Sequence, residues 1–207
     1  ATLVSSVLAL EEMKKVETGY YGGAPGRWEA SAKNRPDVAA TKLKPPVMQF
    51  PNELIFDDGK HRVELHFFGT GHTKGDGYAW LPKEKILFTG DACVNGPQNN
   101  VNDGNSGEWI KTLELAKQLG AEKVCPGHGP MGGPEILADQ QAYFIALQAQ
   151  VKALYDAHKT PEEVKAALPD IGAALKKREH IARYVQPNMT AHVQKVWVEL
   201  GGQPLPK

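Results

Sequence analysis

The chain has 207 residues, of which 41% are hydrophobic, so it is long and apolar enough to fold as one domain with a substantial core. Its 24 basic and 24 acidic residues cancel, which argues against nucleic acid or an anionic membrane surface as a partner. No apolar run approaches the ~20 residues of a membrane span, and the two cysteines are too few for a disulfide framework. This composition is typical of a soluble globular protein.

The N-terminal part of the chain combines two short regular elements with a long irregular segment. Residues 1–6 favour a strand, and the amphipathic stretch 7–16 predicts a helix. Residues 18–47 are rich in glycine and proline and predict a long surface excursion. Loops of this length inside a compact domain are uncommon and are often functional.

The middle of the chain has the pattern of an antiparallel β-meander. Strands are expected at 47–50, 53–56, 61–68, 77–81 and 85–88. The residues Asp57-Asp58-Gly59-Lys60 predict one hairpin turn, with glycine where a positive φ is needed, and Pro82-Lys83-Glu84 predict a second. The first strand of the second hairpin is mainly apolar, so we expect it to be buried on both faces.

Helical patterns follow the meander. Ser106 is expected to cap a helix that ends at Gly120, and a short strand is expected at 123–125. A long helix is predicted over 134–158, and a capping box that begins at Thr160 predicts the start of another. Strands and helices therefore alternate along the chain, and this order predicts an α/β fold.

The C-terminal helices have two interpretations. The last helix, predicted from 189 to 200, has an apolar face that fits either an extra packing layer or a dimerisation surface. We expect a main domain at 1–158 and a helical extension at 159–207 packed on the same domain. A homodimer through these helices is the other use of that apolar face.

Three short motifs follow predicted strands, and glycines flank the candidate ligand in each. They are Gly71-His72-Thr73-Lys74-Gly75-Asp76, Thr89-Gly90-Asp91 and Pro126-Gly127-His128-Gly129-Pro130. Open α/β sheets bind ligands beyond the carboxyl ends of their strands, so this placement suits a site. Two imidazoles and a carboxylate form a donor set that suits Zn²⁺, or iron or manganese less specifically. Each motif alone is more often a surface turn than a ligand.

Taken in this order, the motifs resemble those of the metallo-β-lactamase superfamily. Residues 71–76, the strand pair 77–91 and residues 126–129 are similar to the third, fourth and fifth metal motifs of the family, and the likeness extends over 1–155. The resemblance implies an αββα sandwich, here N-terminally incomplete and with extra C-terminal helices. It also implies a site that holds one or two zinc ions in the complete protein.

The resemblance assigns roles to individual residues. His72 is similar to the last imidazole on the first metal, Asp91 to the carboxylate at the second metal, and His128 to the imidazole that completes the second metal. In the family, a metal-bound hydroxide attacks a small-molecule substrate, which here implies an ester, thioester, lactone or amide, β-lactams included. The family often places substrate contacts in the loop that here carries Asn99 and Asn100, and Lys74 could attract an anionic substrate group. No catalytic residue is assigned.

One family signature is missing from this sequence. The string His-x-His-x-Asp-His, which supplies most of the other ligands, does not occur, and the seven histidines form no His-x-His pair. Either the chain is an incomplete copy of a longer protein, or it is a domain that has lost its site. We favour the first, because the chain starts in mid-architecture and the three remaining motifs keep their glycines. A non-catalytic scaffold or interaction domain is the alternative function.

Overall fold

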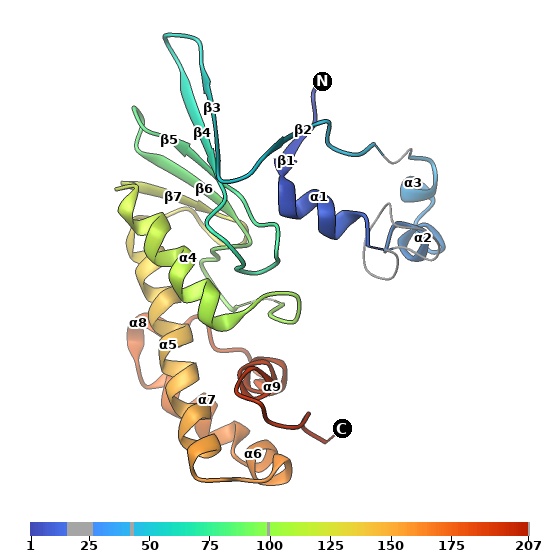
Figure 1. The fold of residues 1–207 in the computed structure, drawn as a ribbon. Coiled ribbons are helices and arrows are strands. Elements are labelled where there is room, and N and C mark those ends of the chain that lie inside the picture. The colour runs from blue at the N-terminus through green and yellow to red at the C-terminus, as the bar shows by residue number, and fades with distance from the viewer. Residues whose placement is uncertain (16–26, 42–43, 99, 207) are drawn as a thin grey trace. The chain divides into compact units, whose positions relative to one another are not determined.

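The computed structural model describes residues 1–15, 27–41, 44–98 and 100–206, which belong to two compact units, Ala1–Leu54 and Ile55–Lys207 (Figure 1). We call them the N-terminal unit and the C-terminal unit. The elements of the N-terminal unit are α1 (Val7–Met13), α2 (Arg27–Ala32), α3 (Pro36–Ala39), β1 (Val4–Ser6) and β2 (Met48–Phe50).

A small parallel sheet and one capped helix organise the N-terminal unit. Strand β1 pairs with β2 in parallel, with Val4 opposite Met48. Helix α1 begins directly after β1 because the Ser6 hydroxyl accepts a hydrogen bond from Ala9 N at 3.2 Å, which satisfies an N-terminal backbone donor. The predicted strand and helix are confirmed here. Of the surface excursion expected over 18–47, residues 18–26 and 42–43 lie outside the described residues. The expectation of a loop is wrong where α2 and α3 form.

The sheet of the C-terminal unit confirms the meander predicted over 53–88, whereas the strand expected at 47–50 is β2, which pairs with β1 in a separate sheet. The strand order in the C-terminal unit is β3-β4-β5-β6-β7, and the strands are β3 (Glu53–Asp57), β4 (Arg62–His66), β5 (Tyr78–Leu81), β6 (Ile86–Gly90) and β7 (Lys123–Pro126). Strand β5 is antiparallel to both β4 and β6, whereas β7 is parallel to β6. Gly59 has a φ of +82° in the turn after β3, the conformation for which glycine was expected there.

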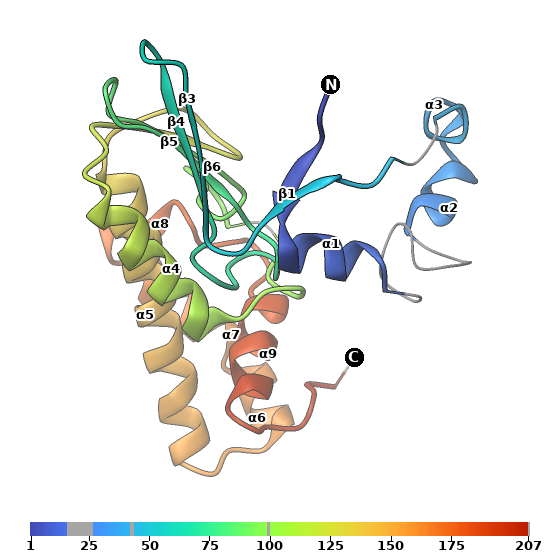
Figure 2. The same cartoon turned by 45° about the horizontal axis from the view of Figure 1, so that its top comes forward.

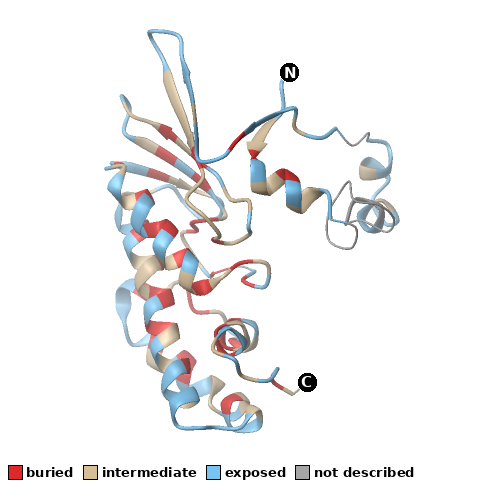
Figure 3. Cartoon of the chain, viewed as in Figure 1, coloured by how far each residue is buried: buried red, intermediate tan, exposed pale blue. Residues whose placement is uncertain are grey.

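Burial alternates along β5 and β6. Trp80, Leu87 and Val124 are opposite one another in adjacent strands, and all three are buried. The neighbouring row points to the other face of the sheet, where Phe88 is 44% exposed. In β5 itself, Tyr78 and Trp80 are buried whereas Ala79 and Leu81 are only partly buried, so the expectation that the strand at 77–81 is buried on both faces is wrong. Its apolar residues are needed on one face only, since helices cover that face (Figure 3).

Helices supply the rest of the C-terminal unit. They are α4 (Ser106–Gln118), α5 (Glu135–Asp156), α6 (Pro161–Ala166), α7 (Leu168–Lys176), α8 (Glu179–Ala182) and α9 (Thr190–Glu199). Helices α4 and α5 lie side by side in both ribbon views, and α9 packs against α5 (Figures 1 and 2). Within the described ranges, no helix combines the length and the hydropathy that crossing a bilayer requires.

Two helix starts test the predicted caps. The capping box is confirmed, because the Thr160 hydroxyl accepts from Glu163 N and the Glu163 side chain accepts from Thr160 N. The cap predicted at Ser106 is wrong by one residue. Asn105 caps α4, with its side-chain oxygen accepting from Glu108 N at 2.8 Å. Ser106 is the first helical residue, and its hydroxyl is bonded to a glutamate from α9.

The C-terminal helices share one hydrophobic core with the sheet. Trp109 of α4 packs against Phe144 of α5, with ring centroids 4.6 Å apart. Val193, Val196 and Trp197, on the apolar face of α9, are all buried inside the chain. These side chains therefore form a packing layer within the C-terminal unit.

The two cysteines are expected to differ sharply in reactivity. Cys93 is fully buried, and this burial raises the pKa of its thiol, so little nucleophilic thiolate forms. Cys125 is partly exposed, with its sulfur 3.4 Å from that of Met131. A disulfide reagent that reports free thiols should label Cys125 in the native protein and both residues in urea. The Cys125→Ser variant is the control, and rapid native labelling of that variant would contradict the expectation.

Candidate metal centre

The three predicted ligand motifs lie at one edge of the sheet. Strands β4 and β6 are both antiparallel to β5, and β7 is parallel to β6, so β4, β6 and β7 run in the same direction. His72 follows β4, Asp91 follows β6 directly, and His128 follows β7. The carboxyl ends of these strands therefore face the same side, as the sequence analysis expected of a ligand-binding edge.

Two of the three predicted ligands are in contact. His128 Nε2 lies 3.3 Å from Asp91 Oδ1, and the side chains are 64% and 35% exposed, respectively. Backbone hydrogen bonds hold their loops together, since Gly127 N donates to Gly90 O at 2.7 Å and Asn95 N donates to His128 O at 2.8 Å. An imidazole nitrogen and a carboxylate oxygen at this separation can bind one cation together.

The third predicted ligand lies in a tightly bonded loop, which we call the His72 loop (residues 69–77). The Asp76 carboxylate accepts hydrogen bonds from Thr73 N at 3.1 Å and from the Thr73 hydroxyl at 2.5 Å. Burial raises the pKa of Asp76, because a carboxylate loses hydration inside the protein. The Asp76 side chain therefore closes the turn that follows His72.

His72 carries an orphaned polar atom. Its Nε2 is buried and has no hydrogen-bond partner among the residues that the structure describes. A buried nitrogen without a partner costs free energy, and coordination of a metal would remove that cost. Among the described residues, His72 does not join Asp91 and His128 in a cluster whose ligand atoms all lie within 4.8 Å of one another. The three side chains match zinc by their donor chemistry, and the contact in the structure is limited to Asp91 and His128.

Trp109 links the His72 loop to the segment that carries Asp91. Its ring contacts the His72 ring edge-on, with centroids 5.8 Å apart. Its indole nitrogen donates to Ala92 O at 2.7 Å, one residue beyond Asp91. The local sequence around Trp109 contains no signal for this hydrogen bond.

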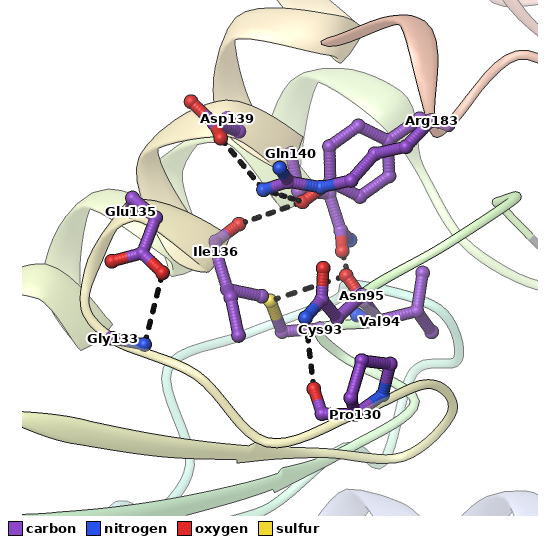
Figure 4. Close-up of polar contacts among 11 residues, drawn as sticks. Cys93, Val94, Asn95, Pro130, Gly133, Glu135, Ile136, Asp139, Gln140 and Arg183 are labelled. Carbon is purple, nitrogen blue, oxygen red and sulfur yellow. Dashed lines mark hydrogen bonds and ion pairs between the residues drawn. The ribbon is translucent and has the colours of Figure 1, made fainter. Parts of the chain in front are cut away.

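Gln140 is a second supporting residue that the sequence analysis missed. It is fully buried on α5, where its Oε1 accepts from Val94 N at 2.7 Å and its Nε2 donates to Ala92 O at 3.2 Å. Figure 4 shows Gln140 close to Val94, and Asn95 pointing to Pro130, whose carbonyl accepts from Asn95 Nδ2 at 2.8 Å. The sequence does contain one signal for a buried role of Gln140. The residues three and four positions away on the helix are apolar, so Gln140 lies on the face that packs into the core.

Of the three residues expected to contact substrate, two are exposed and one lies outside the described residues. Lys74 is exposed in the same loop as His72. Asn100 is also exposed, and its side chain bonds within its own loop, accepting from Asn102 N at 3.0 Å and donating to Asp103 at 3.2 Å. Asn99 lies outside the described residues.

The sequence is similar to known proteins of one family. The sequence profile of the metallo-beta-lactamase superfamily matches residues 7–128. The metallo-beta-lactamase type 2 of Bacteroides fragilis is 33% identical over 107 residues, which are 49% of this chain and 43% of that protein. The corresponding protein of Pseudomonas aeruginosa is 32% identical over 82 residues, or 38% of this chain and 32% of that protein. The chain thus spans less than half the length of these relatives.

A solved structure supports the fold. A double mutant of the sec-alkyl sulfatase PisA1 matches with a TM-score of 0.58 at 16% identity, over 78% of this chain and 27% of that one. The fold and the three loops define an α/β protein with imidazoles and a carboxylate at one sheet edge. Since the family profile covers more than half of the chain, the chain belongs to the metallo-β-lactamase superfamily. The predicted fold class and family are confirmed.

Proposed function

We propose that this chain carries part of the metal centre of a zinc-dependent hydrolase, with His72, Asp91 and His128 as ligands. The observation that carries the proposal is the contact between Asp91 Oδ1 and His128 Nε2 at 3.3 Å. The orphaned Nε2 of His72, in a loop after a strand of the same direction, supports it. Iron or manganese would fit the same donors less specifically.

The proposed chemistry divides between the metal and the chain. When bound, the metal would lower the pKa of water and polarise the oxygen of an acyl substrate. The exposure of Asp91 and His128 leaves them accessible to water and to a small molecule. Lys74 is exposed in the His72 loop, where its ammonium group would attract an anionic substrate. Asn100 and Asn99 remain proposed substrate contacts.

The proposed substrate class is an ester, thioester, lactone or amide. The name metallo-beta-lactamase type 2, which two of the relatives carry, favours a cyclic amide within this class. The second candidate is a non-catalytic scaffold or interaction domain. It is favoured by one observation, namely that the sequence contains no His-x-His-x-Asp-His string.

Zinc binding by defined variants tests the proposal. We expect the 207-residue chain to bind Zn²⁺ weakly through these three ligands and to leave chromogenic lactams and esters intact. Replacing Asp91 or His128 with alanine should weaken binding by more than the ~10–100-fold that is typical of losing an outer-shell partner. Affinity is measured by competition with a chromophoric chelator.

The control for the zinc experiment is His61→Ala, because His61 is an exposed imidazole in the hairpin after β3. This variant should bind zinc as the parent chain does. If the Asp91 and His128 variants also keep the parent affinity, the proposed ligand set is wrong. Zinc-dependent hydrolysis by the parent chain, abolished by His72→Ala, would instead contradict the expectation that this chain alone is inactive.

A further inference from the structure

Helix α9 contacts the segment that leads into α4, although the two are far apart in sequence. Lys195 Nζ donates to Asn102 O at 3.0 Å. The Glu199 carboxylate accepts from Ser106 N at 3.1 Å and from the Ser106 hydroxyl at 2.5 Å. Lys195 and Glu199 also pair with each other at 3.6 Å, and their side chains are mostly buried. One turn of α9 therefore holds both ends of the segment 102–106.

The middle of the same segment contacts the His72 loop. Asn105 N donates to the carbonyl oxygen of Gly71, the residue before His72, at 3.3 Å. Gly104 packs so closely that a β-carbon there would lie 2.0 Å from Gly71 O. A displacement of segment 102–106 would therefore move or release the backbone next to His72.

The local bonding explains why α9 is well suited to this role. Asn105 caps α4, which leaves Ser106 N, another backbone donor at the helix start, for a different acceptor. A carboxylate near a helix N-terminus is favourable, and hydrogen bonds to a charged acceptor are stronger than neutral ones. Gln148 of α5 also donates to the Ser106 hydroxyl, at 2.8 Å, so that hydroxyl both donates and accepts a hydrogen bond.

We propose that Lys195 and Glu199 are positioning residues for His72. They hold segment 102–106 from the side of α9, and this segment in turn holds Gly71 and the ligand that follows it. The inference rests on the proposed function, in which His72 binds the metal. A ligand displaced by a fraction of an ångström loses affinity although no ligand atom has been removed.

Amide hydrogen exchange tests whether α9 holds the segment. In Glu199→Ala, the amide of Ser106 loses its acceptor and should exchange faster whatever the role of the residue. The amide of Asn105 donates to Gly71 O and the amide of Gly71 to Thr73 O, so the substitution removes neither acceptor. These two amides should therefore exchange at least about tenfold faster only if α9 holds the His72 loop through segment 102–106. Lys195→Met should have the same effect on both. The amide of Val124 in β7 is the internal reference for global stability.

Matched variants separate positioning from loss of charge. Glu199→Gln keeps an acceptor for Ser106, and Lys195→Arg keeps a donor for Asn102, so both should retain most of the parent protection. Lys152→Met is the control for removing a lysine. A cavity of about 410 Å³ is lined by Ser106, Glu199 and Lys152. Lys152 pairs with Asp156 and not with Glu199. Exchange at Asn105 and Gly71 should be unchanged in this control.

Zinc affinity is the second readout, with the metal alone as the probe. We expect Glu199→Ala and Lys195→Met to bind Zn²⁺ about 10–100-fold more weakly than the parent, and Lys152→Met to bind it equally well. Unchanged exchange at Asn105 and Gly71 in both variants would overturn the inference, as would unchanged zinc affinity. If the parent chain binds no zinc, the proposed function is wrong. Hydrogen exchange still tests the holding role in that case, because unchanged protection of the Asn105 and Gly71 amides in Glu199→Ala would refute it.

Discussion

Alanine at position 127 should destabilise the protein and abolish zinc binding through the Asp91–His128 pair. A β-carbon at Gly127 would lie 2.1 Å from Asp91 Oδ1, 2.4 Å from the carbonyl carbon of Gly90 and 2.6 Å from Asp91 N. Two of these atoms belong to the backbone, so a change of side-chain rotamer cannot relieve the overlap. We expect a loss of about 3 kcal/mol in the free energy of unfolding, at the upper end of overpacking costs.

The matched control for this prediction is Gly96→Ala. Gly96 lies in the segment that follows Asp91, but a β-carbon there would meet no atom within 4 Å. Its free energy of unfolding in urea and its zinc affinity should therefore stay near the parent values. Unfolding of Gly127→Ala and Gly96→Ala at the same urea concentration would contradict the prediction. The close approach of Gly127 to Gly90 and Asp91 would then not exclude a side chain there.

Truncation of Trp109 should have the largest effect on stability of any single change in α4. Its side chain is 1% exposed and packs against His72 and Phe144. Trp109→Ala should cost about 3–5 kcal/mol in the free energy of unfolding, as expected for a buried aromatic ring. Trp109→Phe keeps a ring but loses the bond to Ala92 O, and should cost about 1 kcal/mol for that bond plus the loss of packing.

Zinc affinity shows whether Trp109 also orders the metal centre. Both Trp109 variants should bind Zn²⁺ more weakly, because the ring and the indole nitrogen connect the His72 loop to the residue after Asp91. The control is Leu175→Ala in α7, which removes a fully buried side chain away from these loops. It should reduce stability without changing zinc affinity. Equal weakening of zinc binding in Leu175→Ala and in the Trp109 variants would mean that global loosening is the cause.

Features with a local physical cause were predicted correctly. The turn at Gly59 needs a positive φ, and the capping box of Thr160 and Glu163 involves residues three apart, so each is written in a few consecutive residues. Strand periodicity predicted the meander for the same reason. The motifs of His72, Asp91 and His128 were recognised by their order and by their glycines.

The helix cap shows where local information ends. Serine and asparagine are both good N-caps, and both stand at the start of α4. The sequence predicts a cap at Ser106, whereas Asn105 forms it. The hydroxyl of Ser106 is used instead by Glu199, which is 93 residues away in sequence. No local pattern distinguishes the two residues, because the competing partner becomes available only when α9 packs beside α4.

Short-range patterns along the chain were enough to predict β1, the strands of the meander, helices α1, α4, α5 and α9, the start of α6, the family, and the three residues proposed as ligands, whereas α2, α3, α7 and α8 were not predicted. Packing between elements settles which face of the sheet is buried, that Asp91 contacts His128, that Trp109 and Gln140 bond to Ala92, and that Glu199 bonds to Ser106. Each of these contacts joins residues from different elements. Their partners are chosen by the packing of helices on the sheet, which no single segment encodes.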